Sequence, residues 1–179
     1  MKTSAPLAAL VTLVLTLAVM APALRAAGLP ATLSIVGETQ LQLTGQGTRE
    51  KLFIDLYTVG LYLPRPLSEV EPIRQHDISK AFRVEVVYDG SIPNEVPENW
   101  WEELVPVLSA QQEEQLKEFY FQLQPQDTIL ISYAPGQGTQ IKINGETKII
   151  DKGHALMSAY IDIWLGGNPV SEELRNSLL

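Results

Sequence analysis

Residues 45–63 read GQGTREKLFIDLYTVGLYL, and this stretch decides the fold. It opens with a Gly-rich motif that predicts a turn or a bulge. The residues at 52–63 are rich in β-branched and aromatic side chains, which favour a strand. Arg49 and Tyr57 are eight residues apart in this run. Because an even spacing places strand residues on one face, we expect both side chains to point the same way.

A cation and a phenol on one apolar face would suit the carboxylate or enolate of an apolar molecule. Guanidinium binds carboxylate through two parallel hydrogen bonds, and a tyrosine hydroxyl adds a further donor. Tyr57 is a better partner for Arg49 than Tyr62, because Tyr62 has the opposite parity. The alternative is that Arg49 and Tyr57 are ordinary sheet-surface residues, which are common in half-buried strands.

The rest of the chain separates strand patterns from helix patterns. Alternating apolar residues and turn signals predict strands at 40–44, 52–63, 81–88, 127–133, 139–143 and 146–150, the last two joined by a hairpin at Asn144-Gly145. Helical spacing predicts helices in the 98–123 region, split at Pro106, at 153–165, and after Pro169 with Ser171 as its cap. This order predicts an α+β fold, an antiparallel sheet covered by helices.

The first 27 residues have the pattern of a secretory signal peptide. Lys2 precedes an apolar run from 5 to 20, and small residues at 21–26 offer cleavage sites. We therefore expect residues 1–27 to be removed, which leaves a single domain at 28–179 in the periplasm. No later segment is long and apolar enough to span a membrane. The alternative is an N-terminal segment that is retained as an anchor.

Composition excludes several classes of function. The chain has 21 acidic and 13 basic residues, for a net charge of −8. Loss of Lys2 and Arg25 with the leader would lower the basic count from 13 to 11, for a net charge of about −10. Such a charge disfavours nucleic acids and anionic lipid surfaces as electrostatic partners.

The chain offers little for metal or covalent chemistry. It contains no cysteine, and its two histidines, His76 and His154, do not stand at a metal-ligand spacing. His154 is expected to be an ordinary helix-end residue. Neither a phosphate-binding loop nor a nucleophile elbow is present in the sequence. We therefore expect no metal, no cofactor and no catalytic nucleophile.

Two segments carry a resemblance to a known family. The first is 45–63, and the second is 160–174, YIDIWLGGNPVSEEL, in which an aromatic-rich helix ends in glycine before a Pro-Val-Ser helix start. Together they resemble the chalcone isomerase superfamily, and within it the bacterial chalcone isomerase-like proteins of the cell envelope. The resemblance covers about residues 30–179. It implies an open-faced β-sandwich in which a cleft lies between a large sheet and its helices.

The resemblance also implies a set of site residues. The enzymes of this superfamily use an early Arg and Thr, a Tyr and an Asn at a strand-to-helix corner, and a late Ser or Thr. Arg49 stands at the position of the Arg, and the early Thr falls at Tyr57, next to Thr58. Asn99 lies one position away from the corner Asn.

Two hydroxyl positions of the enzymes are changed in this chain. The corner Tyr falls at Ile92 or Pro93, and the late Ser or Thr falls at Ile163. Isomerisation needs those hydroxyls to stabilise a phenoxide and polarise a ketone, so we expect no efficient flavanone formation.

An Arg followed by a Tyr resembles instead the fatty-acid-binding members of the superfamily, which receive the ligand's carboxylate with that pair. The leading hypothesis is an exported, non-catalytic domain that binds a small amphipathic acid, such as a fatty acid, with Arg49, Tyr57, Thr58 and Asn99 as the ligand-binding residues. One alternative is an isomerase or lyase that acts on an unknown conjugated ketone. Another is a structural envelope protein whose cleft is filled by its own side chains.

Overall fold

The computed structural model describes residues 28–90 and 96–179. One seven-stranded antiparallel sheet runs through the molecule, with its strands in the same order as in the chain. The strands are β1 (Thr32–Ser34), β2 (Gln40–Lys51), β3 (Ile54–Leu63), β4 (Lys80–Val86), β5 (Thr128–Ala134), β6 (Gly138–Ile143) and β7 (Glu146–Asp151).

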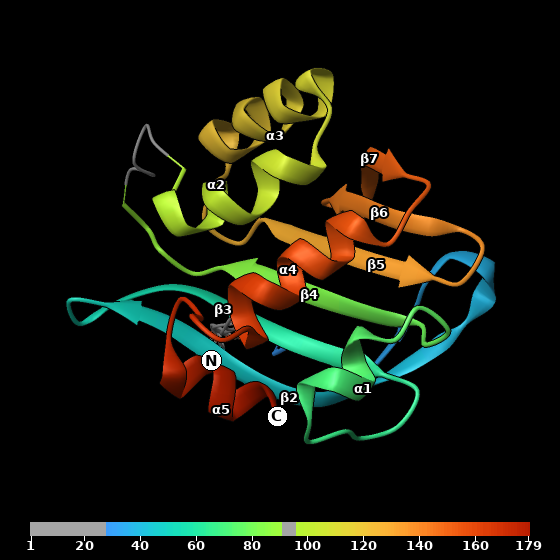
Figure 1. The fold of residues 1–179 in the computed structure, drawn as a ribbon. Coiled ribbons are helices and arrows are strands. Elements are labelled where there is room, and N and C mark those ends of the chain that lie inside the picture. The colour runs from blue at the N-terminus through green and yellow to red at the C-terminus, as the bar shows by residue number, and fades with distance from the viewer. Residues whose placement is uncertain (1–27, 91–95) are drawn as a thin grey trace, which may run out of the picture.

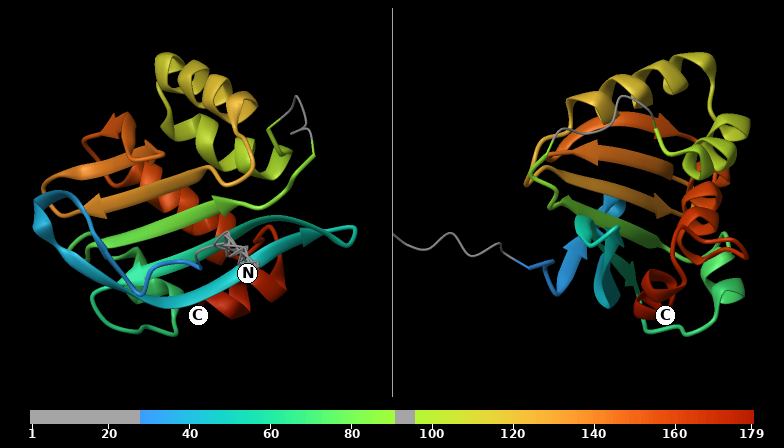
Figure 2. Two further views of the ribbon diagram at one scale, coloured as in Figure 1. Left: turned by 180° about the vertical axis from the view of Figure 1, so that it is seen from behind. Right: turned by 90° about the vertical axis from the view of Figure 1, so that its left-hand side faces the viewer.

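The helices lie on one side of this curled sheet (Figures 1 and 2). They are α1 (Val70–Arg74), α2 (Glu98–Leu104), α3 (Ala110–Gln122), α4 (Ala155–Leu165) and α5 (Glu172–Leu178), with short 3-10 turns at Val36–Glu38 and Val105–Val107. The predicted α+β fold, an antiparallel sheet covered by helices, is confirmed. Among the described residues, none of these helices has the length and apolarity that a membrane crossing requires.

Several local predictions are confirmed in detail. Asn144 and Gly145 form the two-residue turn between β6 and β7 with positive φ angles of 50° and 83°. Ser109 and Gln112 form a capping box at the start of α3. The Ser171 side chain accepts a hydrogen bond from the Leu174 backbone N–H and so caps α5.

Of the two alternatives predicted at the Gly-rich motif, a turn or a bulge, the structure shows the bulge. Strand β2 continues through Gly45 and Gly47, with a register shift between Leu43 and Gly45. The glycines are needed because α5 packs directly on this strand. A Cβ at Gly45 would lie 2.2 Å from the Leu178 carbonyl oxygen, and one at Gly47 would lie 2.8 Å from the Leu174 side chain.

The hairpin turn between β2 and β3 instead lies at Leu52 and Phe53, inside the strand predicted at 52–63. Both residues have left-handed backbones, with φ angles of 53° and 65°. Strand β3 therefore begins at Ile54. The turn was missed because neither residue is one of the glycine, asparagine or aspartate residues that usually mark such turns.

The main core lies between the sheet and the helices. Helix α4 contributes most to it, since eight of its residues are buried, Trp164 among them at 0% exposure. A smaller apolar cluster lies on the opposite face of the sheet, around Tyr62, Ala81 and Leu41. Tyr62 thus points away from the helices, as its parity predicted.

Candidate functional site

A cavity of about 510 Å³ lies between the sheet and the helices. This volume falls in the range of small-molecule sites, and most of the lining is apolar. The sheet contributes Tyr57, Val84, Val86, Ile129, Ile131, Ile141 and Ile143, and the helices contribute Trp100, Leu104, Leu116, Phe119, Tyr120, Tyr160 and Trp164. Arg49, Lys51, Glu98 and Asn99 supply the polar part of the wall.

Arg49 and Tyr57 both line this cavity, and they lie directly opposite each other on β2 and β3. Direct cross-strand partners share a face, with Cβ atoms about 5 Å apart. The two residues therefore share a face, as predicted, but for a different reason. The spacing argument treated them as members of one strand, whereas the turn at 52–53 brings them together across two.

The Tyr57 hydroxyl is positioned to donate a hydrogen bond. Trp164 Nε1 donates to Tyr57 Oη at 3.1 Å, and the Trp100 ring packs edge-on at 5.9 Å between ring centres. Burial raises the pKa of Tyr57, an effect that the Trp164 hydrogen bond and the Arg49 charge partly offset. Within residues 28–90 and 96–179 the Tyr57 proton has no acceptor, so it remains available to a ligand oxygen.

Arg49 supplies the positive charge on the cavity wall. Its side chain is half-buried, and Nη1 donates to the Glu50 carbonyl oxygen at 2.7 Å. In the described part of the chain no carboxylate lies within ion-pair distance of Arg49. Because guanidinium has five N–H donors, most of them stay free for an anionic ligand.

The other predicted site residues occupy different places. Thr58 lies on the opposite face of the sheet, where its hydroxyl is 3.0 Å from that of Thr48. It cannot belong to this cavity, because consecutive strand residues face opposite ways and Tyr57 faces the helices. Asn99 is an exposed residue of α2 and lines the cavity wall.

The resemblance matches the enzymes' corner Tyr to Ile92 or Pro93, and both of these residues lie outside the described part of the chain. The position matched to the late Ser or Thr, Ile163, is packed in the main core with 2% exposure.

Sequence reasoning did not assign Tyr120, Tyr160 and Trp164 to the site. All three line the cavity, and burial raises the pKa of both tyrosines. The Tyr160 ring stacks on Trp164 with 5.6 Å between ring centres. A signal was present for this pair, since residues four apart share one face of a helix.

A polar cluster around Lys80 and His154 lies in the core, outside the cavity. Lys80 is 0% exposed, and its Nζ lies 2.6 Å from the Gln75 carbonyl oxygen and 3.1 Å from His154 Nε2. Burial lowers the pKa of Lys80 to about 8 and that of His154 to about 4. His154 does begin a helix, as expected, but it is a buried residue with 7% exposure.

The fold brings His76 and His154 together, with 4.2 Å between their ring centres. Nevertheless, no group of three or more His, Cys, Asp or Glu side chains suited to a metal ion occurs in the part of the chain that the structure describes.

Comparison with known protein families assigns the chain to a family. The model of the chalcone isomerase-like family matches residues 21–179. The chain belongs to the chalcone isomerase-like family. This family member is similar in structure to an Arabidopsis thaliana fatty-acid binding protein, with a TM-score of 0.57 and 21% identity over 84% of this chain and 90% of that one. At that identity the likeness shows the fold alone. Comparison with curated protein sequences found no significant match.

Proposed function

We propose that this chalcone isomerase-like protein is a non-catalytic binding protein for a small amphipathic acid, such as a fatty acid. The observation that carries the proposal is the apolar cavity of about 510 Å³ with Arg49 and Tyr57 side by side on its wall. The ligand's carboxylate accepts from the Arg49 guanidinium and the Tyr57 hydroxyl. Its tail lies along the apolar residues of β4, β5, β6 and α3, where burial of apolar surface supplies affinity.

Two further facts support binding rather than catalysis. The Arabidopsis protein with this fold is a fatty-acid binding protein. The resemblance to the enzymes matches their late hydroxyl to Ile163, and this residue is buried in the core. A hydroxyl is needed there to hold the substrate oxygen or a water, and an isoleucine side chain has no polar atom to offer.

Arg49→Ala is expected to weaken fatty-acid binding by about 2 kcal/mol, or roughly 30-fold, because it removes a charge-assisted hydrogen bond. The measurement is a titration with cis-parinaric acid, a fluorescent fatty acid. Arg49→Lys should recover only part of the affinity, since an ammonium cannot make the two-pronged contact. Thermal melts should be nearly unchanged, because Arg49 makes no ion pair with the described residues.

Arg65→Ala is the matched control, because Arg65 is exposed and does not line the cavity. It makes the same change in charge and should leave the affinity intact. Equal affinities of wild type and Arg49→Ala would end the proposed role of Arg49. Conversion of a chalcone well above the uncatalysed rate, lost in Arg49→Ala, would show that the protein is an enzyme.

We also propose that the protein is exported to the periplasm with loss of residues 1–27. Lys2, the apolar run that follows it and the small residues at 21–26 support this assignment. N-terminal sequencing of protein from the envelope fraction of the native host should find a first residue near position 28. Protein that begins at Met1 and stays in the cytoplasm would contradict it.

A further inference from the structure

The tip of the β2–β3 hairpin carries large apolar side chains that are exposed to solvent. Phe53 is 96% exposed and Leu52 is 81% exposed, the two highest values among the large exposed apolar residues of the described chain. Ile54, the next residue, is 46% exposed. Adjacent apolar residues of this size are costly on the surface of a monomer and are typical of sites that contact another apolar phase.

Turn geometry does not explain the choice of these residues. Leu52 and Phe53 have φ angles of 53° and 65°, a conformation that side chains with a Cβ rarely adopt. The other two-residue hairpin of this chain uses Asn144 and Gly145 at the same two positions, which is the favourable pairing. The chain therefore bears both backbone strain and exposed apolar surface at one tip, and such combinations mark functional sites.

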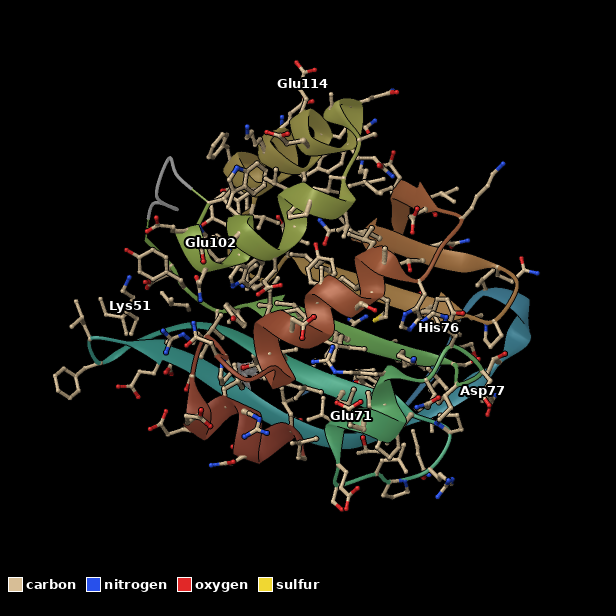
Figure 3. The ribbon with its side chains drawn as sticks, viewed as in Figure 1. Lys51, Glu71, His76, Asp77, Glu102 and Glu114 are labelled. Atoms are coloured by element: carbon tan, nitrogen blue, oxygen red, sulfur yellow. The ribbon has the colours of Figure 1, made fainter. Side chains whose placement is uncertain are left out.

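The tip lies at the entrance of the cavity. Lys51, Leu52 and Ile54 line the cavity together with Arg49. In two opposite views the hairpin extends past the helices at one end of the molecule (Figures 1 and 2). Figure 3 places Lys51 at this end, beside the tip. A surface that the tip touched would thus be next to the residues proposed to receive a carboxylate.

We propose that Leu52 and Phe53 insert into the interface of a lipid bilayer and hold the cavity entrance against it. A bilayer interface accepts exposed apolar side chains, while a flanking lysine stays at the level of the headgroups. The chain carries a net charge of −8, so the attraction comes from the apolar tip and favours zwitterionic over anionic lipid. Together with the proposed function, this contact would let an amphipathic acid pass from the bilayer into the cavity.

The absence of cysteine from the chain permits a direct test. Phe53→Cys in the full chain carries one environment-sensitive fluorophore at the tip. The matched control is Ile150→Cys, which labels an exposed apolar residue, 60% accessible, on the edge strand β7, far from the hairpin in the strand order. Both proteins are mixed with phosphatidylcholine vesicles that contain nitroxide groups on the acyl chains. Since only the tip should reach the acyl region, quenching at 53 should be at least about fivefold stronger than at 150.

Attachment through residues 1–27 would affect both labelled proteins alike, so it cannot produce a difference between them. Equal quenching at the two positions would therefore overturn the proposal. A blue shift of the tip fluorophore without vesicles, accompanied by a dimer in sedimentation, would also overturn it. That result would mean that a second copy of the chain covers the tip. The vesicles in this experiment hold no fatty acid, so the outcome does not depend on the proposed ligand.

A second variant links the tip to ligand transfer. Phe53→Gly removes the aromatic ring and suits the positive φ angle at this position, so the hairpin should be retained. The transfer rate of cis-parinaric acid from phosphatidylcholine vesicles to the protein should fall roughly tenfold. Affinity for the same probe delivered from water should be unchanged, because Phe53 does not line the cavity. An unchanged transfer rate would contradict the proposal. If neither the wild type nor the variant bound cis-parinaric acid, that result would count against the proposed function instead.

Discussion

Replacing Trp164 by alanine is expected to lower the free energy of unfolding by about 3–5 kcal/mol, the range for loss of a fully buried large aromatic. Trp164 is 0% exposed. The centre of its ring system lies 4.7 Å from the ring centre of Phe82 and 5.6 Å from that of Tyr160. Trp164 also donates the hydrogen bond to Tyr57, so the substitution leaves a void and an unpartnered phenol oxygen together.

Urea denaturation followed by circular dichroism measures this loss without relying on tryptophan fluorescence. Trp164→Phe keeps most of the volume but loses the donor to Tyr57, so it should cost about 1–2 kcal/mol. Trp101→Ala is the control, because Trp101 is half-buried beneath Lys117, with 4.8 Å from Nζ to the ring centre. It should cost about 1 kcal/mol. Equal losses in Trp164→Ala and Trp101→Ala would contradict the central packing role assigned to Trp164.

Acidification from pH 6.5 to about pH 4 is expected to remove about 2–3 kcal/mol of stability through His154 alone. Burial, followed by the charges of Lys80, His76 and Arg74, lowers the pKa of His154 from 6.5 to about 4. Its neutral ring lies 3.1 Å from Lys80 Nζ through Nε2 and 2.8 Å from Ser158 Oγ through Nδ1. A proton on Nε2 would bring two cations together at the N-terminus of α4, where positive charge is unfavourable.

The sign of the effect follows from proton uptake. Between pH 4 and 6.5 His154 is protonated in the unfolded chain and neutral in the folded chain. Unfolding therefore takes up a proton, and the free energy of unfolding decreases as the pH is lowered. The contribution is complete above pH 6.5. The groups that face His154 are Lys80 of β4, Tyr133 of β5, Ser158 of α4, Arg74 of α1, and His76 in the segment between α1 and β4.

His154→Gln separates this residue from the carboxylates, which titrate in both proteins. The free energy of unfolding of each protein is measured by urea denaturation from pH 4.5 to 8. The glutamine variant is expected to be less stable at pH 7 and to show a flatter dependence between pH 4.5 and 6.5. Parallel slopes for the two proteins would mean that His154 titrates normally.

Local interactions account for what the sequence determined by itself. The Asn144-Gly145 turn and the Ser109 and Ser171 caps depend on hydrogen bonds between residues a few positions apart, so they can be predicted from the residues that form them. Alternation and helical spacing likewise predicted the α+β order. The resemblance carried by 45–63 and 160–174 predicted the cleft between sheet and helices.

Only the tertiary structure decided how the site is assembled. The Gly-rich motif stays extended because α5 packs against Gly45 and Gly47, and that contact involves residues more than 120 positions later in the chain. The turn therefore moves to 52–53, where it sets Arg49 opposite Tyr57.

Trp164 reaches Tyr57 across 107 positions, and His154 reaches Lys80 across 74. Local propensity carries no information about such distant partners. They are selected by the packing of α4 on the sheet, because burying its apolar face determines which side chains meet there.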